Sequence, residues 1–241
     1  MNAKQPDISV VIPAFNEEES IALCLSEVKK AMDLTGRAYE IIVVDDGSAD
    51  KTFEILREQK KTMPELVAVR FASNQGQTAA FDAGFRTARG KIIATMDADL
   101  QNDPADIPRL VALVGQWDVV CGYRQKREDS VVRRISSRIA NGVRNRLTHE
   151  TIRDVGCSLR AFRAECVRNL KLFDGMHRFL PTLFKLDGFT VTEVPVNHRP
   201  RKLGKSKYGV FNRLFKALRD LFAVRWMQRR WLRYKIEETL R

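Results

Sequence analysis

The chain has 241 residues, enough for one full hydrophobic core, and its 44% hydrophobic and 30% charged residues are typical of a globular protein. The sequence contains neither a run of about 20 apolar residues nor an N-terminal apolar segment, so we expect no transmembrane helix, no signal peptide and a cytoplasmic location. The net charge of +12 is uneven, because residues 199–241 hold 14 Lys/Arg and only 3 Asp/Glu, whereas residues 1–198 hold 28 and 27. Such a basic segment indicates an anionic partner, either nucleic acid or a membrane surface.

Short apolar runs alternate with helical patterns along the chain. The runs predict strands at about 8–12, 39–44, 66–71, 92–96 and 189–196, and the segments between the first four predict helices at about 17–34, 51–60 and 78–88. Pro13 is expected to end the first strand, because proline cannot donate to a central ladder. The glutamates at 17–19 are expected in the first turn of the first helix, where they favour the helix dipole. The alternation predicts an α/β fold with a mostly parallel sheet flanked by helices.

Acidic side chains follow two of these strands. Asp45 comes directly after the second strand, and Asp97 and Asp99 follow the fourth, with Gln101 close by. Ligands of open α/β sheets bind at the carboxyl ends of the strands, and Mg²⁺ prefers one or two carboxylates with water and substrate phosphates. The pattern therefore predicts a divalent metal that holds a diphosphate. A turn at Asp97 and a helix cap at Asp99 are the competing interpretation.

Other cofactor motifs and metal spacings do not occur in the sequence. No G-x-G-x-x-G follows the first strand and no G-x-x-x-x-G-K-[ST] occurs, which argues against a dinucleotide enzyme and a P-loop NTPase. The cysteines and histidines are too scattered for a metal cluster, and we expect reduced, mostly buried thiols. These residues are Cys24, Cys121, Cys157, Cys166, His149, His177 and His198.

Three segments carry a resemblance to a known family. They read VVIPAFNE at 10–17, VVDDGS at 43–48 and MDADLQ at 96–101. With these motifs the chain resembles the family 2 glycosyltransferases, in particular the branch of dolichyl-phosphate mannosyltransferase and the bacterial polyprenyl-phosphate glycosyltransferases. The likeness continues with Gly122-Tyr123-Arg124, with Arg138, and with RKLGKSK at 201–207, which matches that branch's R-x-x-G-x-S-K. It covers roughly residues 7 to 210.

The resemblance implies a GT-A fold over residues 1–207. It also implies an inverting transfer of a sugar from a nucleotide diphosphate sugar, GDP-mannose-like or a UDP-sugar, to a polyprenyl or dolichyl phosphate at the cytoplasmic membrane face. By motif position, the implied nucleotide-sugar site consists of Pro13, Phe15, Glu17, Asp45, Asp97, Ala98, Arg201 and Lys207. The implied ligands of Mg²⁺ or Mn²⁺ are Asp97, Asp99 and Gln101. The implied catalytic residues are Asp99, as base or orienting group, and Arg124 and Arg138, which would hold the acceptor phosphate.

The sequence departs from the family pattern in two places. Phe15 stands where a tyrosine is common, so a hydroxyl contact to the nucleotide is lost. Many relatives also carry transmembrane helices after the basic segment, and this chain ends without them. Asp154 and Ser158 match the branch's D-x-x-x-S, which is expected either to line the acceptor side or to form a turn with a buried thiol.

The chemistry of such a transfer agrees with the residue types. A phosphate acceptor needs no base, because its second pKa is about 6 and it is already largely ionised at pH 7. It needs guanidinium groups, which bind phosphate in a bidentate manner. Residues 124–163 contain ten arginines, most of which we interpret as a solvated basic face.

Residues 208–241 predict a basic amphipathic helix that lies on an anionic membrane surface. The alternative is a helix packed on the sheet, or against a membrane-protein partner or a second copy of the chain. Three other functions compete with lipid-phosphate glycosylation. They are transfer to a polysaccharide or lipopolysaccharide by the same family, a phosphatase with Asp97 as nucleophile, and nucleic-acid binding through the basic tail. We expect no nucleic acid, since that function leaves the acidic strand ends unexplained.

Overall fold

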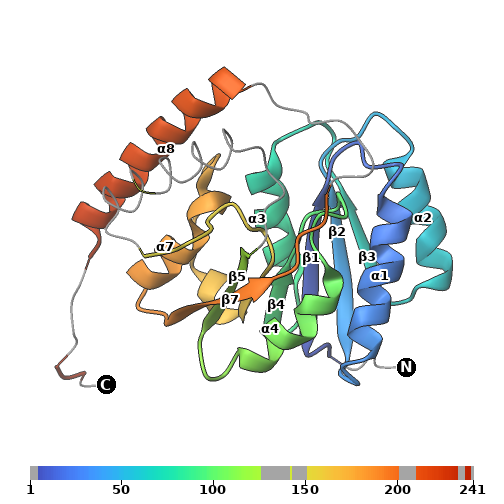
Figure 1. Ribbon diagram of the computed structural model, residues 1–241, viewed down its shortest axis with the longest axis horizontal. Helices are drawn as coiled ribbons and strands as arrows, with labels where there is room; N and C mark the ends of the chain where they lie inside the picture. Colours follow the sequence, from blue (N-terminus) through green and yellow to red (C-terminus); the bar gives the residue numbers. More distant parts are fainter. Residues whose placement is uncertain (1–4, 126–141, 143–150, 201–209, 233–236, 240–241) are drawn as a thin grey trace.

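The computed structural model describes residues 5–125, 142, 151–200, 210–232 and 237–239. The predicted alternation of strands and helices is confirmed in the first half of the chain (Figure 1). That half contains β1 (Ile8–Ala14), α1 (Ile21–Asp33), β2 (Tyr39–Asp45), α2 (Thr52–Thr62), β3 (Leu66–Arg70), α3 (Gln77–Thr87) and β4 (Ile92–Thr95). The second half contains η1 (Pro104–Asp106), α4 (Ile107–Leu113), β5 (Val119–Arg124), β6 (Arg160–Arg163), α6 (Glu165–Arg168), η2 (Met176–Phe179), α7 (Leu180–Leu186), β7 (Val191–Val196) and α8 (Val210–Arg230).

The strands form one sheet of seven in the order β3-β2-β1-β4-β6-β5-β7. β6 pairs antiparallel with both β4 and β5, and the other described strand pairs are parallel. The prediction of a mostly parallel sheet is therefore confirmed. Because β1, β2 and β4 run in the same direction side by side, their carboxyl ends meet at one edge of the sheet.

Helices cover both faces of this sheet. On one face, α1, α2 and α4 pack on a core that includes Val10 and Ile12 of β1. On the other face, α3 and α7 pack on a core that includes Val11, which lies between Val10 and Ile12 in the sequence. The alternation follows from the two-residue period of a strand. All four cysteines are buried free thiols, as expected.

The prediction that Pro13 ends β1 is wrong. The strand continues to Ala14, and Pro13 pairs in register with Val44 of β2. Val11 accepts a hydrogen bond from Met96 at the β4 side, whereas Ala14 accepts one from Asp46 at the β2 side. Main-chain polar groups alternate between the two sides of a strand, so those of Pro13 point to the β4 side, as those of Val11 do. The pairing of β1 with β4 has already ended at Val11. The missing N–H of Pro13 therefore costs no ladder hydrogen bond.

The expected start of α1 is also wrong. The helix begins at Ile21, so the glutamates at 17–19 precede it, and its first turn contains no acidic residue. The carbonyl of Glu17 accepts hydrogen bonds from the main-chain N–H groups of Ser20 and Ile21, and its Oε2 accepts one from Ser20 Oγ at 2.7 Å. These bonds form the turn that leads into the helix.

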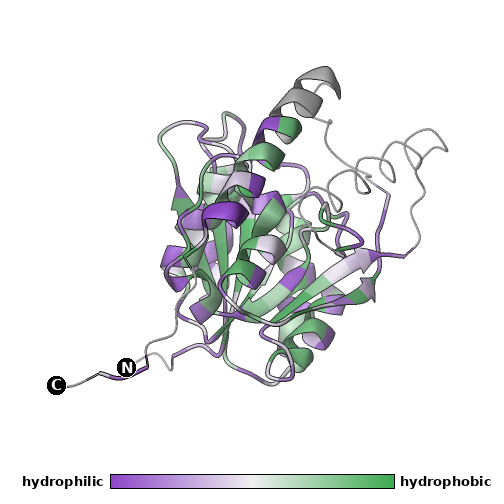
Figure 2. Ribbon diagram, turned by 90° about the vertical axis from the view of Figure 1, so that its left-hand side faces the viewer, coloured by the Kyte–Doolittle hydropathy of each residue, from purple (hydrophilic) through white to green (hydrophobic). Residues whose placement is uncertain are grey.

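Helix α8 packs across the domain on the side away from α1 and α2 (Figures 1 and 2). Leu221 and Val224 are buried in the same core as α3 and α7, and Asp220 is also buried. In the part of the chain that the structure describes, no helix combines the length and hydropathy needed to cross a membrane.

Candidate active site

The site begins at the carboxyl end of β4, where the sequence predicts it. Asp97 and Asp99 follow this strand, and both side chains are partly exposed. Asp97 Oδ1 accepts a hydrogen bond of 2.8 Å from Gln77 Nε2, at the start of α3. Asp97 Oδ2 accepts one of 2.7 Å from Ser158 Oγ, which comes from the segment before β6. Side chains far apart in sequence therefore meet at this carboxylate.

The loop after β4 is folded by its own polar groups. Asp97 N donates to Asn102 Oδ1 at 3.0 Å, and Asp99 Oδ1 accepts from Gln101 N at 3.1 Å. Leu100 lies between them with φ 62°. The turn predicted by the competing interpretation is thus present, whereas the residue that caps the next helix is Asp103, not Asp99. The turn leaves both carboxylates at the edge of the sheet.

Charges of both signs surround Asp97. Burial and the nearby Asp99 carboxylate raise the pKa of Asp97 to about 6. The Ser158 hydrogen bond and the guanidinium groups of Arg160 and Arg124 act in the opposite direction. A carboxylate pushed toward protonation by a second carboxylate gains from a cation placed between them.

The donor set fits a divalent cation that is completed by substrate. The described residues contain no group of three or more His, Cys, Asp or Glu positioned to hold a metal ion. Two carboxylates with open positions are, however, the set that Mg²⁺ uses when waters and phosphate oxygens complete its octahedron. Asp97, Asp99 and Gln101 lie within one five-residue turn, so they suit such a shared site.

A second acidic position lies at the carboxyl end of β2, which β1 separates from β4. Asp45 is fully buried, and its Oδ1 accepts a hydrogen bond from Ser48 N at 3.0 Å. Its Oδ2 lies 3.3 Å from Arg70 Nε but receives no hydrogen bond. Its two partners, Ser48 and Arg70, line an open pocket of about 360 Å³ together with Gly47, Phe71 and Ala72. A buried acceptor without a donor is costly, and an N–H or O–H group of a ligand would satisfy it.

The motif residues at the end of β1 and directly after it lie beside Asp45. In the sheet register Pro13 pairs with Val44 and Ala14 with Asp45. Glu17 N donates to Thr52 Oγ1 at 2.8 Å, which ties the segment to α2. The structure therefore brings the segment of Pro13, Phe15 and Glu17 together with Asp45, and it places Ala98, which is buried, next to Asp97 in the loop after β4.

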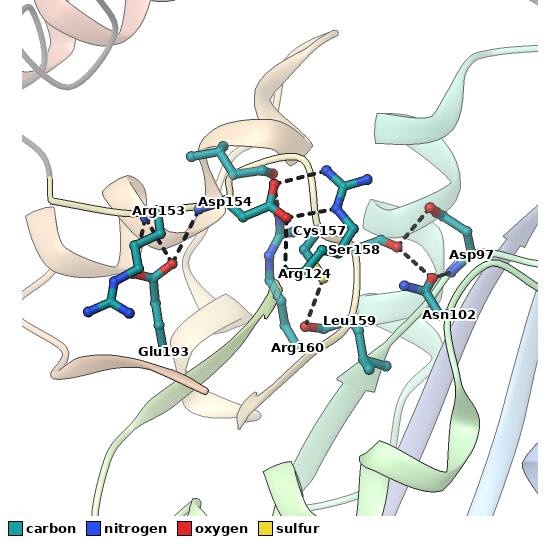
Figure 3. A network of polar contacts seen from close by, with 11 residues as sticks. Asp97, Asn102, Arg124, Arg153, Asp154, Cys157, Ser158, Leu159, Arg160 and Glu193 are labelled. Atoms are coloured by element: carbon teal, nitrogen blue, oxygen red, sulfur yellow. Dashed lines mark hydrogen bonds and ion pairs between the residues drawn. The ribbon is translucent and has the colours of Figure 1, made fainter. Parts of the chain in front are cut away.

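On the other side of Asp97, Arg124 forms a bidentate ion pair with Asp154 (Figure 3). Arg124 Nε lies 2.7 Å from Asp154 Oδ2 and Nη2 lies 2.9 Å from Oδ1. Gly156 leaves the space for this guanidinium, because an added Cβ there would lie 2.9 Å from Arg124 Nη2. The predicted role of Arg124 in holding a phosphate stays a prediction. Arg138, Arg201 and Lys207 lie outside the described residues.

Several residues of this region were missed in the sequence analysis. Gln77 and Asn102 contact Asp97, and Arg160 is buried and donates to the carbonyl oxygens of Val155 and His177. No short motif marks these residues, because their partners lie far away in the sequence. Arg160 is one of the ten arginines of residues 124–163, and its burial shows that it does not belong to a solvated basic face.

The seven-stranded sheet with an acidic turn at its carboxyl edge defines a GT-A-type protein. The chain belongs to glycosyl transferase family 2, whose model matches residues 9–171. The chain superposes on glucosyl-3-phosphoglycerate synthase from Mycobacterium tuberculosis, in complex with Mn²⁺, UDP and glucosyl-3-phosphoglycerate, with a TM-score of 0.69 and 18% sequence identity. The superposition covers 92% of this chain and 80% of the other. The chain also superposes on the mannosyltransferase PcManGT from Pyrobaculum calidifontis, in complex with GDP-Man and Mn²⁺, with a TM-score of 0.65 and 21% sequence identity. This superposition covers 91% of this chain and 64% of the other. These likenesses confirm the predicted fold.

Two curated relatives are more similar in sequence. The chain is 42% identical, over 89% of its length, to undecaprenyl-phosphate 4-deoxy-4-formamido-L-arabinose transferase of Edwardsiella ictaluri, of which the match covers 66%. It is 40% identical, over 92% of its length, to dodecaprenyl-phosphate galacturonate synthase of Rhizobium johnstonii, of which the match covers 68%. The chain thus spans about two thirds of the length of these relatives.

Proposed function

We propose that this protein transfers a sugar, with inversion, from a nucleotide diphosphate sugar to a polyprenyl phosphate. The observation that carries the proposal is the shared sheet edge at which only β1 separates the Asp97–Asp99 turn after β4 from the Asp45 segment at the end of β2. One end of this edge suits a diphosphate with its metal and the other suits a nucleoside. Relatives of about 40% identity that are named for undecaprenyl and dodecaprenyl phosphate support the acceptor. A polysaccharide or lipopolysaccharide acceptor is the alternative within the same family.

Asp97, Asp99 and Gln101 would hold Mg²⁺ or Mn²⁺, which neutralises charge on the leaving diphosphate when bound. The buried Oδ2 of Asp45 would accept a hydrogen bond from the nucleoside, with Pro13, Phe15, Glu17 and Ala98 around it. Arg201 and Lys207 would reach the diphosphate. Their segment follows Arg199, whose main-chain N–H donates to the carbonyl oxygen of Gln101 at 2.9 Å. The segment 201–207 therefore begins close to the turn that holds the proposed metal ligands.

The acceptor supplies its own nucleophile. An oxygen of the ionised phosphate forms the new bond to the anomeric carbon, while the bond from that carbon to the donor diphosphate breaks and the diphosphate leaves with the electron pair. No proton has to be removed from the phosphate oxygen at pH 7. Arg124 and Arg138 would hold the acceptor phosphate, and Asp99 would orient the reacting groups.

We also propose that α8 holds the enzyme on the anionic cytoplasmic face of the inner membrane. Leu218, Phe222 and Trp226 are exposed and lie at intervals of four residues, so they form one apolar stripe on the helix. Arg229 and Arg230 are exposed at its end, and the Arg219 side chain is 71% exposed beside the stripe. An exposed apolar stripe among arginines suits an anionic bilayer surface. On this proposal, residues 1–207 form the transferase domain and 208–241 the attachment segment.

The test is thermal unfolding with UDP, GDP, ADP and CDP, each with and without Mn²⁺, followed by a transfer assay with undecaprenyl phosphate and the sugar nucleotide of the base that binds. A ligand that binds the folded state raises the unfolding temperature by mass action. We expect one diphosphate to stabilise the protein in the presence of Mn²⁺ only. A protein that is intact and stabilised by none of the four would contradict the proposal.

A further inference from the structure

Donors from two other parts of the fold converge on Asp97. Gln77 lies 20 residues before it in the sequence and Ser158 lies 61 residues after it, yet each donates to a different carboxylate oxygen. Asp99 Oδ1, by contrast, accepts from the main chain of its own turn. The orientation of the Asp97 carboxylate is therefore set by the tertiary structure.

Ser158 is fixed in place around Asp97 (Figure 3). Its carbonyl accepts a hydrogen bond of 2.6 Å from Thr95 Oγ1, the last residue of β4, and only 8% of the residue is exposed. Its hydroxyl also lies 2.9 Å from Asn102 Oδ1, the same oxygen that accepts from Asp97 N. The hydroxyl is thus held between the carboxylate and the amide that shapes the turn.

Gln77 is fixed in a similar way. The residue before it, Gly76, donates its N–H to Asp46 Oδ2 at 2.9 Å. The residue after it, Thr78, accepts from Gly175 N at 3.0 Å and lies 2.6 Å from His177 Nδ1. The start of α3 is therefore tied on both sides, and the Gln77 amide has a defined position above Asp97.

An ionised carboxylate has about four lone-pair directions. Two hydrogen bonds, one on each oxygen, leave directions open on both oxygens for a cation and prevent the carboxylate from rotating away. We propose that Gln77 and Ser158 are positioning residues that hold the Asp97 carboxylate for a divalent cation and so set the metal affinity of the site. This inference rests on the proposed metal role of Asp97. Partners of this kind typically contribute 10- to 100-fold to metal affinity.

The experiment is a titration with Mn²⁺, alone and with UDP or GDP, in which free Mn²⁺ is followed by its electron paramagnetic resonance signal. The variants are Ser158→Ala and Gln77→Leu, each of which removes one donor to Asp97. Ser26→Ala, on the exposed side of α1, is the matched control. Thermal unfolding without metal establishes that each variant is folded, and the partly exposed Gln77 provides a test even if the buried Ser158 variant does not fold.

We expect Mn²⁺ to bind about 10- to 100-fold more weakly to each of the two variants, and with wild-type affinity to the control. The Mn²⁺ concentration that half-activates sugar transfer should rise equally, while the rate at saturating Mn²⁺ recovers. A general loss of structure would not be restored by excess metal. Unchanged Mn²⁺ affinity in a folded variant would overturn the positioning role of that residue. Wild-type protein that takes up no Mn²⁺ with either diphosphate would instead refute the proposed function itself.

Discussion

Asp45 and Asp46 are adjacent in the sequence, yet their carboxylates contact different parts of the molecule. Asp46 accepts hydrogen bonds from Gln75 N, Gly76 N and Asn74 Nδ2 at 2.6 to 2.9 Å, so it fixes the loop before α3. Asp45 Oδ2 receives no hydrogen bond, and its neighbours Ser48 and Arg70 line the open pocket. Asp46 thus has a structural role, whereas Asp45 is the carboxylate that we propose binds the nucleoside.

Replacing Asp45 by alanine should weaken nucleoside diphosphate binding. A hydrogen bond to a charged group contributes about 1.5 to 3 kcal/mol, so we expect about a 10- to 100-fold rise in the dissociation constant. Isothermal titration calorimetry with the nucleotide that stabilises the wild type measures it. Asp82→Asn, on the solvent side of α3, is the control and should bind as the wild type does. Equal affinity in Asp45→Ala and the control would mean that the nucleoside binds elsewhere.

Replacing Asp97 or Asp99 by asparagine should abolish metal-dependent transfer. The metal contributes several kcal/mol to stabilising the charge of the leaving diphosphate, so the rate at a fixed Mn²⁺ concentration should fall by about 100-fold or more. Steady-state assays with increasing Mn²⁺ measure this loss. Asp33→Asn at the end of α1, whose side chain is half exposed, is the matched control. Transfer at the wild-type rate in either variant, or in a strong chelator, would contradict the metal site.

Removing the aromatic side chains of the α8 stripe should weaken membrane attachment. Phe222 and Trp226 are 65% and 64% exposed, so their replacement by alanine leaves the domain core intact. Burial of one such side chain stabilises by roughly 1.5 to 3 kcal/mol, and we expect the double variant to bind anionic liposomes at least about 10-fold more weakly. Cosedimentation measures the effect. Trp117→Ala, an exposed tryptophan elsewhere, is the control. Unchanged sedimentation of the double variant would exclude α8 as the membrane contact.

His177 should make the protein less stable in acid. Burial, with the nearby charges of Arg178 and Arg160, lowers the pKa of His177 to about 3. In the unfolded chain the group titrates near 6.5, so its contribution is complete above pH 6.5 and is lost as the pH falls toward 3. The loss approaches about 1.4 kcal/mol per pH unit. Urea unfolding between pH 7 and 4 should show a shallower decline for His177→Gln than for the wild type, and equal slopes would contradict the assignment.

The sequence predicts the elements well where one rule decides them. Apolar runs predict β1, β2, β3 and β4, and acidic pairs mark the ends of β2 and β4, where we propose the nucleoside and metal positions. The predicted ends of elements were wrong where strand pairing or a local hydrogen-bonded turn determines the boundary. Pro13 stays in β1 because the β4 side is already free of partners there, and α1 starts late because Glu17 forms a turn.

The contacts around Asp97 could not be predicted from local patterns. Gln77 and Ser158 belong to no metal-ligand motif, and their hydrogen bonds to Asp97 form only when the start of α3 and the segment before β6 come together at the carboxyl end of β4. Ser158 was noted as part of D-x-x-x-S, but an acceptor-side lining and a turn were both open, and neither pointed to Asp97. Tertiary hydrogen bonds of this kind depend on strand order, which motif spacing does not encode.

The contact between α8 and the domain has a consequence for the proposed membrane attachment. Asp220 of α8 is buried against Gly175, where an added Cβ would lie 2.7 Å from Asp220 Cγ, and Gly175 in turn donates to Thr78 at the start of α3. The inner side of the helix is therefore joined to the body of the protein. If a bilayer binds the outer side of the helix, it would fix the orientation of the whole protein relative to the membrane plane. Every acceptor phosphate in the bilayer would then approach the proposed active site along the same direction.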